Sequence, residues 1–566
     1  MTNKIGIGIQ DFAKLREVQG FYIDKTSFIR EWWESKDDAT LITRPRRFGK
    51  TLNMSMVENF FSVEYAGRAD LFEGLSIWQD KKYRKLQGTY PVISLSFARV
   101  KEANYETTRE KICQILTNLY IKYSFVRDSE VLTDADRLYY DRMLSLEIRD
   151  SDVTSSIYQL SNYLYRYYEK KVIILLDEYD TPMQEAYVNG FWDEMVAFTR
   201  SLFNSAFKTN PYMERAIMTG ITRVSKESVF SDLNNLEVIT TTSDKYATSL
   251  GFTEEEVFAA LDMCGLGGEK EEVKRWYDGF VFGEHKDIYN PWSILNYLDS
   301  QQYTTYWANT SANSLVGKLI REGNRDIKEK FEKLLCGECI WTEIDEQIVY
   351  NQLNGSEEAV WSLLLASGYL KVLSYESYLD IGERFAPRYQ LALTNLEVKI
   401  MFQRMIHDWF VPVKSEYNDF VKAMFLGDVD AMNEYMNRVA LQTFSYFDTG
   451  ERASGAEPER FYHGFVLGLL VDLQGSYYVK SNRESGFGRY DVMLEPKKPG
   501  KHPAVILEFK VRSTRKENSL EETAQSALAQ IKDRKYSEEL KEKGIAGEQI
   551  KEYGFAFEGK NVLIVN

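Results

Sequence analysis

The sequence predicts an α/β protein with a parallel sheet in its N-terminal part, a helix-rich middle region and a second α/β domain at its C-terminus. Up to about residue 250, short apolar runs alternate with long helical patterns. From about residue 251 the pattern becomes helix-rich, and near the C-terminus two strand-like runs flank a turn. We therefore expect three domains, spanning residues 1–250, 251–449 and 450–566.

The composition is that of an ordinary globular protein with several domains. The chain has 566 residues, 44% of them hydrophobic and 27% charged, and this length exceeds one usual core. Its net charge of -15 excludes a protein coated for non-specific DNA binding, because phosphate contacts require clustered Lys and Arg. From about residue 450 the charges are roughly balanced, which is compatible with local contact to nucleic acid.

The cysteines and the apolar runs bear on the cellular compartment. Only 4 cysteines occur, which argues against a disulfide framework and fits a reducing cytoplasm. Cys336 and Cys339 have CxxC spacing, but without a second such pair or a His pair we expect no zinc site. The N-terminus lacks an apolar signal segment, and no apolar run is long enough to span a bilayer. We expect a cytoplasmic protein with no membrane partner.

Four apolar runs are the candidates for buried parallel strands. They span residues 39–43, 91–97, 172–176 and 215–220, and helical patterns such as 106–123 and 155–168 separate them. The first run leads into the loop 44–51, which ends in Gly49-Lys50-Thr51 and is followed by a helical pattern. Strand, loop and helix in this order bind phosphate through backbone N–H groups and the helix N-terminus.

In that loop, Lys50 would reach the β and γ oxygens of a nucleotide and Thr51 would hold Mg²⁺, with Arg47 and Gly49 completing the phosphate-binding set. The usual GxxxxGK[ST] pattern would place glycine at position 44, where this chain has Arg44. The turn must then form there without a residue that tolerates positive φ. A helix that merely starts with Gly-Lys-Thr is the alternative interpretation.

The third run ends in Asp177 and Glu178, at the carboxyl end of a strand where ligands of parallel sheets bind. Asp177 would support the Mg²⁺ shell and Glu178 would polarise the attacking water. A strand that ends in acids because it reaches solvent is the alternative. After the fourth run, Thr219 or Thr222 could sense a γ-phosphate. Arg223 could touch this phosphate or form an ordinary surface salt bridge.

The C-terminal strand-like runs, residues 488–494 and 504–511, predict a hairpin. The period of two places Glu508 and Lys510 on one face, and the neighbouring strand can bring Asp491 to it. Asp491 and Glu508 would bind Mg²⁺, and Lys510 would orient water or neutralise charge during phosphodiester cleavage. An exposed hairpin with an ordinary Glu/Lys pair is the alternative.

A helical pattern over 459–470 precedes this hairpin and another over 521–536 follows it. This order resembles PD-(D/E)XK nuclease-like domains, although Tyr490 stands where proline is usual. The resemblance implies a restriction-endonuclease-like α/β fold, an auxiliary acid at Glu459, and Gln530 and Tyr536 as residues that contact nucleic acid or support the site. We interpret His463 as a helix-packing residue.

Residues 1 to about 300 resemble the AAA-ATPase-like family of bacterial proteins. The resemblance rests on four segments: Tyr22-Ile23-Asp24-Lys25-Thr26, the loop 44–51, Leu176-Asp177-Glu178-Tyr179-Asp180 and Tyr289-Asn290-Pro291-Trp292-Ser293. It implies a P-loop NTPase sheet that binds ATP, with a catalytic Glu, and arginine in place of the first loop glycine is similar to the family's usual form. Members often end in a PD-(D/E)XK-like domain.

Together these features predict an ATPase whose nucleotide state regulates a Mg²⁺-dependent DNA nuclease, through the arrangement or the homo-oligomerisation of the second half. The alternative is a signalling or interaction ATPase whose terminal domain binds nucleic acid or a partner without cutting it. A phosphotransferase is disfavoured because no motif for a second substrate is visible.

Overall fold

The computed structural model describes residues 5–145, 148–223, 230, 233–308, 314–345, 353, 356–381, 386–409, 414–437, 468, 471–485, 488–500, 502–512, 517–558 and 561–566. The chain forms two compact units, Met1–Ala312 with Cys339–Lys399, and Asn313–Glu338 with Ile400–Asn566. Residues 251–449 contribute to both units, and the domain boundaries expected from the sequence stay predictions. Within the described part of the chain, we find no helix with the length and apolarity needed to cross a membrane.

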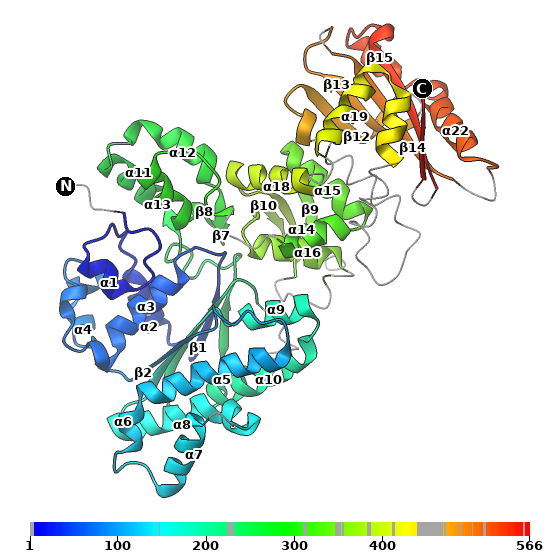
Figure 1. Ribbon diagram of the computed structural model, residues 1–566. Coiled ribbons are helices and arrows are strands. Elements are labelled where there is room, and N and C mark those ends of the chain that lie inside the picture. The colour runs from blue at the N-terminus through cyan, green and yellow to red at the C-terminus, as the bar shows by residue number, and fades with distance from the viewer. Residues whose placement is uncertain are drawn as a thin grey trace. The chain divides into compact units, whose positions relative to one another are not determined.

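A five-stranded parallel sheet organises the first unit (Figure 1), as predicted. The strand order is β2-β3-β4-β1-β5, and every pairing is parallel. The strands are β1 (Ala39–Thr43), β2 (Val92–Ser96), β3 (Val172–Asp177), β4 (Met213–Gly220) and β5 (Leu236–Ile239). Because β4 lies between β1 and β3, the carboxyl ends of these three strands meet at one edge. The predicted α/β class is confirmed.

Helices cover this sheet, with α1, α2 and α3 to one side of it and α5, α8 and α10 to the other (Figure 1). The first group forms a core with strand residues such as Ile42, Ile173 and Ile217. The helices of this part are α1 (Phe12–Glu17), α2 (Ser27–Ser35), α3 (Lys50–Phe61), α4 (Lys81–Arg84), α5 (Tyr105–Lys122), α6 (Ser124–Arg127), α7 (Asp134–Leu144), α8 (Asp150–Tyr168), α9 (Thr181–Asn189) and α10 (Trp192–Phe207). Alternation of strand and helix along the chain requires this layered arrangement.

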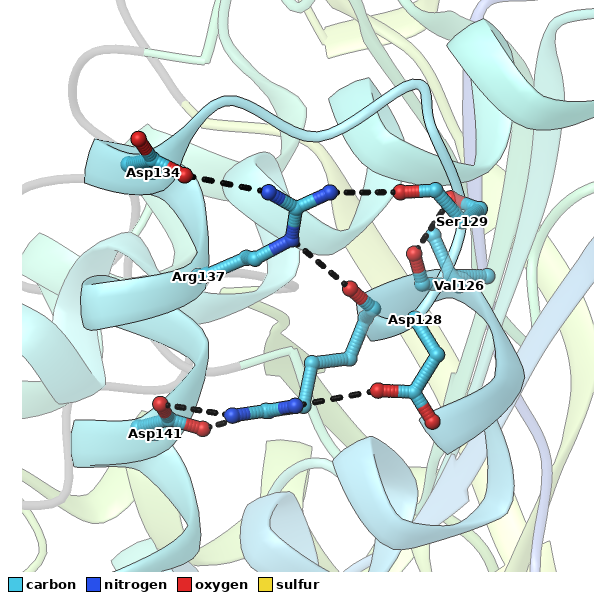
Figure 2. Close-up of polar contacts among 7 residues, drawn as sticks. Val126, Asp128, Ser129, Asp134, Arg137 and Asp141 are labelled. Carbon is cyan, nitrogen blue, oxygen red and sulfur yellow. Dashed lines mark hydrogen bonds and ion pairs between the residues drawn. The ribbon is translucent and has the colours of Figure 1, made fainter.

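Two arginines hold the connection between α6 and α7 (Figure 2). Arg127 pairs with Asp128 at 2.9 Å and with Asp141 at 2.6 Å. Arg137 pairs with Asp134 at 3.1 Å and donates a hydrogen bond to the carbonyl of Ser129 at 2.9 Å. Such surface pairs each contribute less than about 1 kcal/mol. This network therefore fixes the geometry of a turn and does not form a ligand site.

The helix-rich region after residue 251 also contains two three-stranded sheets of the first unit, ordered β6-β8-β7 and β10-β11-β9. Their strands are β6 (Phe252–Thr253), β7 (Phe280–Phe282), β8 (His285–Tyr289), β9 (Ile340–Glu343), β10 (Leu370–Glu376) and β11 (Arg388–Leu393). The helices are α11 (Glu254–Met263), α12 (Lys270–Tyr277), α13 (Pro291–Ser300), α16 (Glu357–Ala366) and α17 (Tyr378–Ile381). These sheets bring residues from separate segments beside the loop 44–51.

The second unit is built on a mixed sheet with the order β12-β13-β14-β15-β16. Its strands are β12 (Tyr477–Ser485), β13 (Gly488–Pro496), β14 (Ala504–Val511), β15 (Ile550–Glu558) and β16 (Asn561–Val565). The predicted hairpin forms, since β13 and β14 pair antiparallel. The pair β14 and β15 is parallel, and the connection between them includes α22 (Leu520–Asp533) and α23 (Ser537–Glu542).

Successive residues of β14 pack on opposite faces of this sheet. Ile506 packs with Leu528 and Ile531 of α22, whereas Leu507 belongs to a core that includes Phe420 of α19 (Lys414–Leu426). Glu508 and Lys510 therefore share the face of Ile506, toward α22. Two further helices of this unit are α14 (Ser314–Glu322) and α15 (Arg325–Cys336). The chain passes from the first unit to the second inside α18 (Leu396–Trp409).

Candidate functional site

The loop 44–51 joins the carboxyl end of β1 to the start of α3. The ammonium of Lys50 is buried and donates hydrogen bonds to the carbonyls of Arg44 and Pro45, at 2.8 Å each. Burial lowers the pKa of Lys50. Positive φ angles occur at Arg47 (65°) and Gly49 (80°), and not at Arg44. The loop thus turns later than the usual glycine pattern implies, which removes the need for glycine at position 44.

Arg44 itself has a structural role. Its side chain is fully buried, its guanidinium lies 4.3 Å from the ring centre of Phe282, and its Nη1 donates to the carbonyls of Thr43 and Thr240. Burial lowers the pKa of Arg44 to about 9. The backbone N–H of Arg44 donates to the carbonyl of Gly220 at 3.1 Å. The start of the loop is therefore anchored to the end of β4.

Asp177, at the end of β3, accepts hydrogen bonds from two hydroxyl groups. Thr51 Oγ1 donates to its Oδ2 at 2.8 Å, and Thr219 Oγ1 donates to its Oδ1 at 2.5 Å. Burial raises the pKa of Asp177, and these two hydrogen bonds act against that shift. The structure thus brings Thr51, Asp177 and Thr219 together. A carboxylate beside a hydroxyl is an oxygen set of the kind that binds Mg²⁺.

Glu178 and Asp180 follow directly. Glu178 is half-buried with a positive φ of 52°, a backbone conformation that costs on the order of 1 kcal/mol for a non-glycine residue. Asp180, which sequence reasoning did not single out, is buried and accepts from the N–H groups of Ile221 and Thr222, both at 2.9 Å. These hydrogen bonds fix the turn after β4 and the position of Thr222. The signal for it was a third acid in the run Asp-Glu-Tyr-Asp.

A cavity of about 350 Å³ opens beside these residues. The polar residues that line it include Arg46, Arg47, Lys50, Thr51 and Glu178. The apolar residues that line it include Ile9, Leu15, Phe21, Ile23, Phe252 and Leu295. Arg223 is half-buried and is not one of the described residues that line the cavity. A cavity lined by both cationic and apolar side chains suits a ligand that has a phosphate chain and an aromatic base.

The start of α13 lies against the loop. Asn290 donates from Nδ2 to the carbonyl of Arg46 at 3.2 Å, while its Oδ1 caps the helix by accepting from Trp292 N at 2.9 Å. The guanidinium of Arg47 lies 4.3 Å from the ring centre of Trp292, a cation–π distance. Asn290 and Trp292 belong to a segment that carried the resemblance, but no role followed from the sequence for either.

The second candidate site lies in the second unit. Asp491 precedes Val492, which is paired with Leu507, so Asp491 lies beside Glu508. The side chain of Glu508 is only 3% exposed, and its Oε2 has no hydrogen-bond partner among the described residues. Burial, and next the charge of Asp491, raise the pKa of Glu508 to about 8, while Lys510 acts in the opposite direction. The structure therefore groups Asp491, Glu508 and Lys510 as expected.

Other groups orient these side chains. Asp491 Oδ2 accepts from the backbone N–H of Phe509 at 2.8 Å. Lys510 Nζ donates to Oγ of Ser526 at 2.9 Å and to its carbonyl at 3.2 Å. Ser526 comes from α22, and sequence reasoning did not find it because no local pattern connects the two segments. This contact holds the Lys510 ammonium on the α22 face of the sheet.

Two residues implied by the family resemblance also reach this site. Gln530 donates from Nε2 to Oε1 of Glu508, and Tyr536 is buried with its pKa raised by burial, next to Gln530. Glu459 and His463 lie outside the described residues. Among the described residues, no group of three or more Asp, Glu, His or Cys side chains is placed to hold a metal ion. Among the described residues, Asp491 and Glu508 are the carboxylates that could hold a cation here.

The chain is similar to proteins of known sequence or structure. A protein of Azotobacter chroococcum mcd 1, "Uncharacterized protein in vnfD 5'region", is 27% identical over 399 residues, which are 70% of this chain and 68% of that protein. A solved structure of a signal transduction ATPase with numerous domains (STAND) and a tetratricopeptide repeat sensor, from Pyrococcus horikoshii, is 11% identical with a TM-score of 0.23. The match covers 80% of this chain and 56% of that one, and at this score it carries no argument.

Two family models match the chain, one for each candidate site. Residues 6–230, which contain the loop 44–51 and Asp177, match the family described as "Predicted AAA-ATPase". Residues 457–566, which contain Asp491, Glu508 and Lys510, match the PD-(D/E)XK nuclease superfamily. The chain therefore contains a predicted AAA-ATPase domain at residues 6–230 and a domain of the PD-(D/E)XK nuclease superfamily at residues 457–566.

Proposed function

We propose that this protein binds and hydrolyses ATP with Mg²⁺ in its first unit, and that the nucleotide state regulates a Mg²⁺-dependent DNA nuclease in its second unit. The observation that carries the proposal is that each unit groups a lysine with carboxylates at one edge or face of a sheet. In the first unit these are Lys50 and Asp177, and in the second they are Lys510, Asp491 and Glu508.

The hydrogen-bond donors and cations of the first site support ATP binding. Backbone N–H groups at the start of α3 and the ammonium of Lys50 would contact the phosphates, with Arg47 adding positive charge at the mouth of the cavity. Thr51 and Asp177, already hydrogen-bonded at 2.8 Å, would hold Mg²⁺, which when bound neutralises charge on the β and γ phosphates. Glu178 lines the cavity and would accept a proton from the attacking water.

The charged side chains of the second site, two carboxylates and an ammonium, support phosphodiester cleavage. Glu508 has a buried, unpartnered Oε2 beside a second carboxylate, which is an unfavourable arrangement that a divalent cation would relieve. Mg²⁺ bound by Asp491 and Glu508 would supply Lewis-acid activation of water and phosphate. Lys510, positioned by Ser526, would neutralise charge that develops on the phosphate. Gln530 would orient Glu508 through their hydrogen bond.

A second candidate is a signalling or interaction ATPase whose terminal domain binds DNA or a partner without cutting. Two observations at Asp491 and Glu508 favour it. Both carboxylates already accept hydrogen bonds, from Phe509 and Gln530, and among the described residues no third carboxylate joins them to hold a metal ion. The two candidates share the ATPase and differ only in the chemistry of the second unit. Homo-oligomerisation is compatible with both.

Cleavage assays separate the candidates. We expect the purified full-length protein to cut supercoiled, linear or single-stranded DNA with Mg²⁺, and Asp491→Ala and Lys510→Ala to lower the rate by about 10²–10³. Lys541→Ala serves as the matched control, because Lys541 is exposed and pairs with its helix neighbour Glu538. Cleavage that survives in both Asp491→Ala and Lys510→Ala would overturn the nuclease assignment. Absence of cutting with any nucleic acid, alongside ATP turnover, would favour the second candidate.

A further inference from the structure

A chain of buried contacts leads away from the loop 44–51. Asn290 Nδ2 donates to the carbonyl of Arg46 at 3.2 Å, and the same side chain caps α13. Three positions further along the chain, Ser293 is fully buried and donates from Oγ to Oε2 of Glu397 at 2.8 Å. The first turn of α13 thus touches the loop with Asn290 and Trp292, and it contacts Glu397 with Ser293.

Glu397 is a buried carboxyl in the first turn of α18. Its side chain is 1% exposed, and its Oε1 accepts from the backbone N–H of Trp307 at 2.6 Å and of Ala308 at 3.3 Å. Burial raises the pKa of Glu397 to about 7, and its hydrogen bonds to Ser293, Trp307 and Ala308 act against that shift. The side chain joins three segments that are far apart in the sequence.

A second route reaches the same helix start. A Cβ atom on Gly368 would lie 2.7 Å from Cγ of Pro45, so the absence of a side chain allows Pro45 to pack closely there. The carbonyl of Gly368 accepts from Oγ1 of Thr394 at 2.7 Å, and Thr394 lies two residues before α18. The loop 44–51 is therefore connected to the N-terminus of α18 through two independent sets of contacts.

These contacts end at α18, which is the helix that continues from the first unit into the second. Its first residues, Leu396–Lys399, belong to the first unit, and the chain enters the second unit at Ile400 within the same helix. A helix is a stiff element, which is a property required of a structure that transmits a displacement. The loop also has a means of producing a displacement. A bound phosphate would compete with the carbonyls of Arg44 and Pro45 for the N–H donors of Lys50.

We propose that Ser293 and Glu397 are positioning residues that transmit the nucleotide state of the loop 44–51 to α18, and through α18 to the second unit. This inference rests on the proposed function, because it requires ATP to bind at the loop. A nucleotide that changes the bonding of Pro45, Arg46 and Arg47 alters the two routes at their origin. The contacts at the start of α18 therefore differ between the ATP-bound and the ATP-free protein.

The test is hydrogen exchange of the full chain with and without ATP and Mg²⁺. In the wild-type protein we expect ATP to change amide exchange across residues 396–409 at least about fivefold, the lower end of usual coupling strengths. In Ser293→Ala, which removes the link from α13 and leaves the hydrogen bonds of Glu397 to Trp307 and Ala308 in place, this change should fall below about twofold. ATP affinity, measured by calorimetry, should stay within about threefold of wild type.

Glu397→Gln is the matched control. A glutamine carbonyl can accept from Trp307 and Ala308, and its amide N–H can donate to Ser293 Oγ, so the link survives with one hydrogen bond reversed. We expect this variant to keep the response to ATP. If Ser293→Ala does not fold, Thr394→Val, which has the same shape but no hydroxyl, tests the second route and should weaken the response.

The outcomes distinguish this inference from the proposed function. Absence of ATP binding by the wild-type protein contradicts both. ATP binding without any change of exchange over residues 396–409, or a full change in Ser293→Ala, contradicts only the inference. A merely structural role for Ser293 would lower the thermal stability and leave the response of α18 to ATP intact.

Discussion

The carboxylates of the two candidate sites differ in the groups that surround them. In the first unit, Asp177 is surrounded by neutral donors, the hydroxyls of Thr51 and Thr219, and Lys50 is bonded to loop carbonyls. In the second unit, Glu508 lies beside a second acid, Asp491, and the pKa of Glu508 is raised to about 8. Both oxygens of Asp177 therefore accept a hydrogen bond from a hydroxyl, whereas Oε2 of Glu508 has no hydrogen-bond partner among the described residues.

This difference suggests how each site responds to its ligands. A hydrogen-bonded loop can exchange internal partners for phosphate oxygens at little cost, which suits repeated binding and release of a nucleotide. A buried pair of carboxylates is unfavourable unless a cation or a proton neutralises it, which would favour metal binding at the second site. Substitutions that affect one site and leave the other intact test the comparison directly.

The largest expected effect concerns ATP turnover. We expect Lys50→Ala and Glu178→Gln to lower the rate of ATP hydrolysis by about 10²–10⁴, because the first removes the cation of the loop and the second removes the group that accepts the proton. Phosphate release under saturating ATP and Mg²⁺ measures this rate. Glu110→Gln, at an exposed position on α5, is the control. Turnover at the wild-type rate in Lys50→Ala would contradict the assignment of the first site.

An intermediate effect should be confined to the second unit. A Cβ atom on Gly554 would lie 2.4 Å from the backbone carbonyl oxygen of Ala524, so Gly554→Ala must push α22 away from β15. We expect a loss of about 2–3 kcal/mol in the stability of this unit, with weaker DNA cleavage and unchanged ATP turnover.

Calorimetric unfolding and the two activity assays check this prediction. Gly547→Ala is the control, because a Cβ atom there meets only the end of the Lys541 side chain at 3.8 Å. Equal loss of ATP turnover and of DNA cleavage in Gly554→Ala would show that the two sites are not as separate as the comparison requires.

The smallest expected effect is a pH dependence of the first unit. The pKa of Glu397 is raised from 4.5 to about 7, so the folded protein retains a proton that the unfolded chain has lost. This stabilisation is fully present below pH 4.5 and is lost as the pH rises through about 7. It amounts to about 3 kcal/mol.

Because glutamine does not titrate, Glu397→Gln should reduce the decline of the unfolding temperature between about pH 5 and 8. Calorimetry at several pH values measures this slope, with the exposed Glu110→Gln as reference. Identical slopes in wild type and Glu397→Gln would mean that the carboxyl is ionised in the folded protein throughout this range.

Long apolar runs made much of the fold predictable. β1, β2, β3 and β4 form where short runs rich in apolar residues predict buried strands, and the hairpin of β13 and β14 forms as expected. The sheets after residue 251 were not predicted, because β7 has only 3 residues and β10 exposes Leu373 and Tyr375, which hides any alternation. Tertiary packing decides such short strands.

The candidate sites were predictable only where the residues lie within a local pattern. Lys50, Thr51 and Asp177 follow from strand ends, and Glu508 and Lys510 follow from the period of two. Trp292, Ser526 and Glu397 meet their partners through contacts between separate segments, for instance across 104 residues from Ser293 to Glu397. Periodicity within one segment carries no information about which distant segments touch.

The most direct test of the account measures DNA cleavage by the full-length protein with Mg²⁺, with and without ATP, in the wild type and in Lys50→Ala. The account predicts that ATP changes the cleavage rate of the wild-type protein at least about fivefold and has no effect in Lys50→Ala, whose metal site in the second unit is unaltered. Cleavage at the same rate with and without ATP in the wild-type protein would contradict nucleotide control of the nuclease.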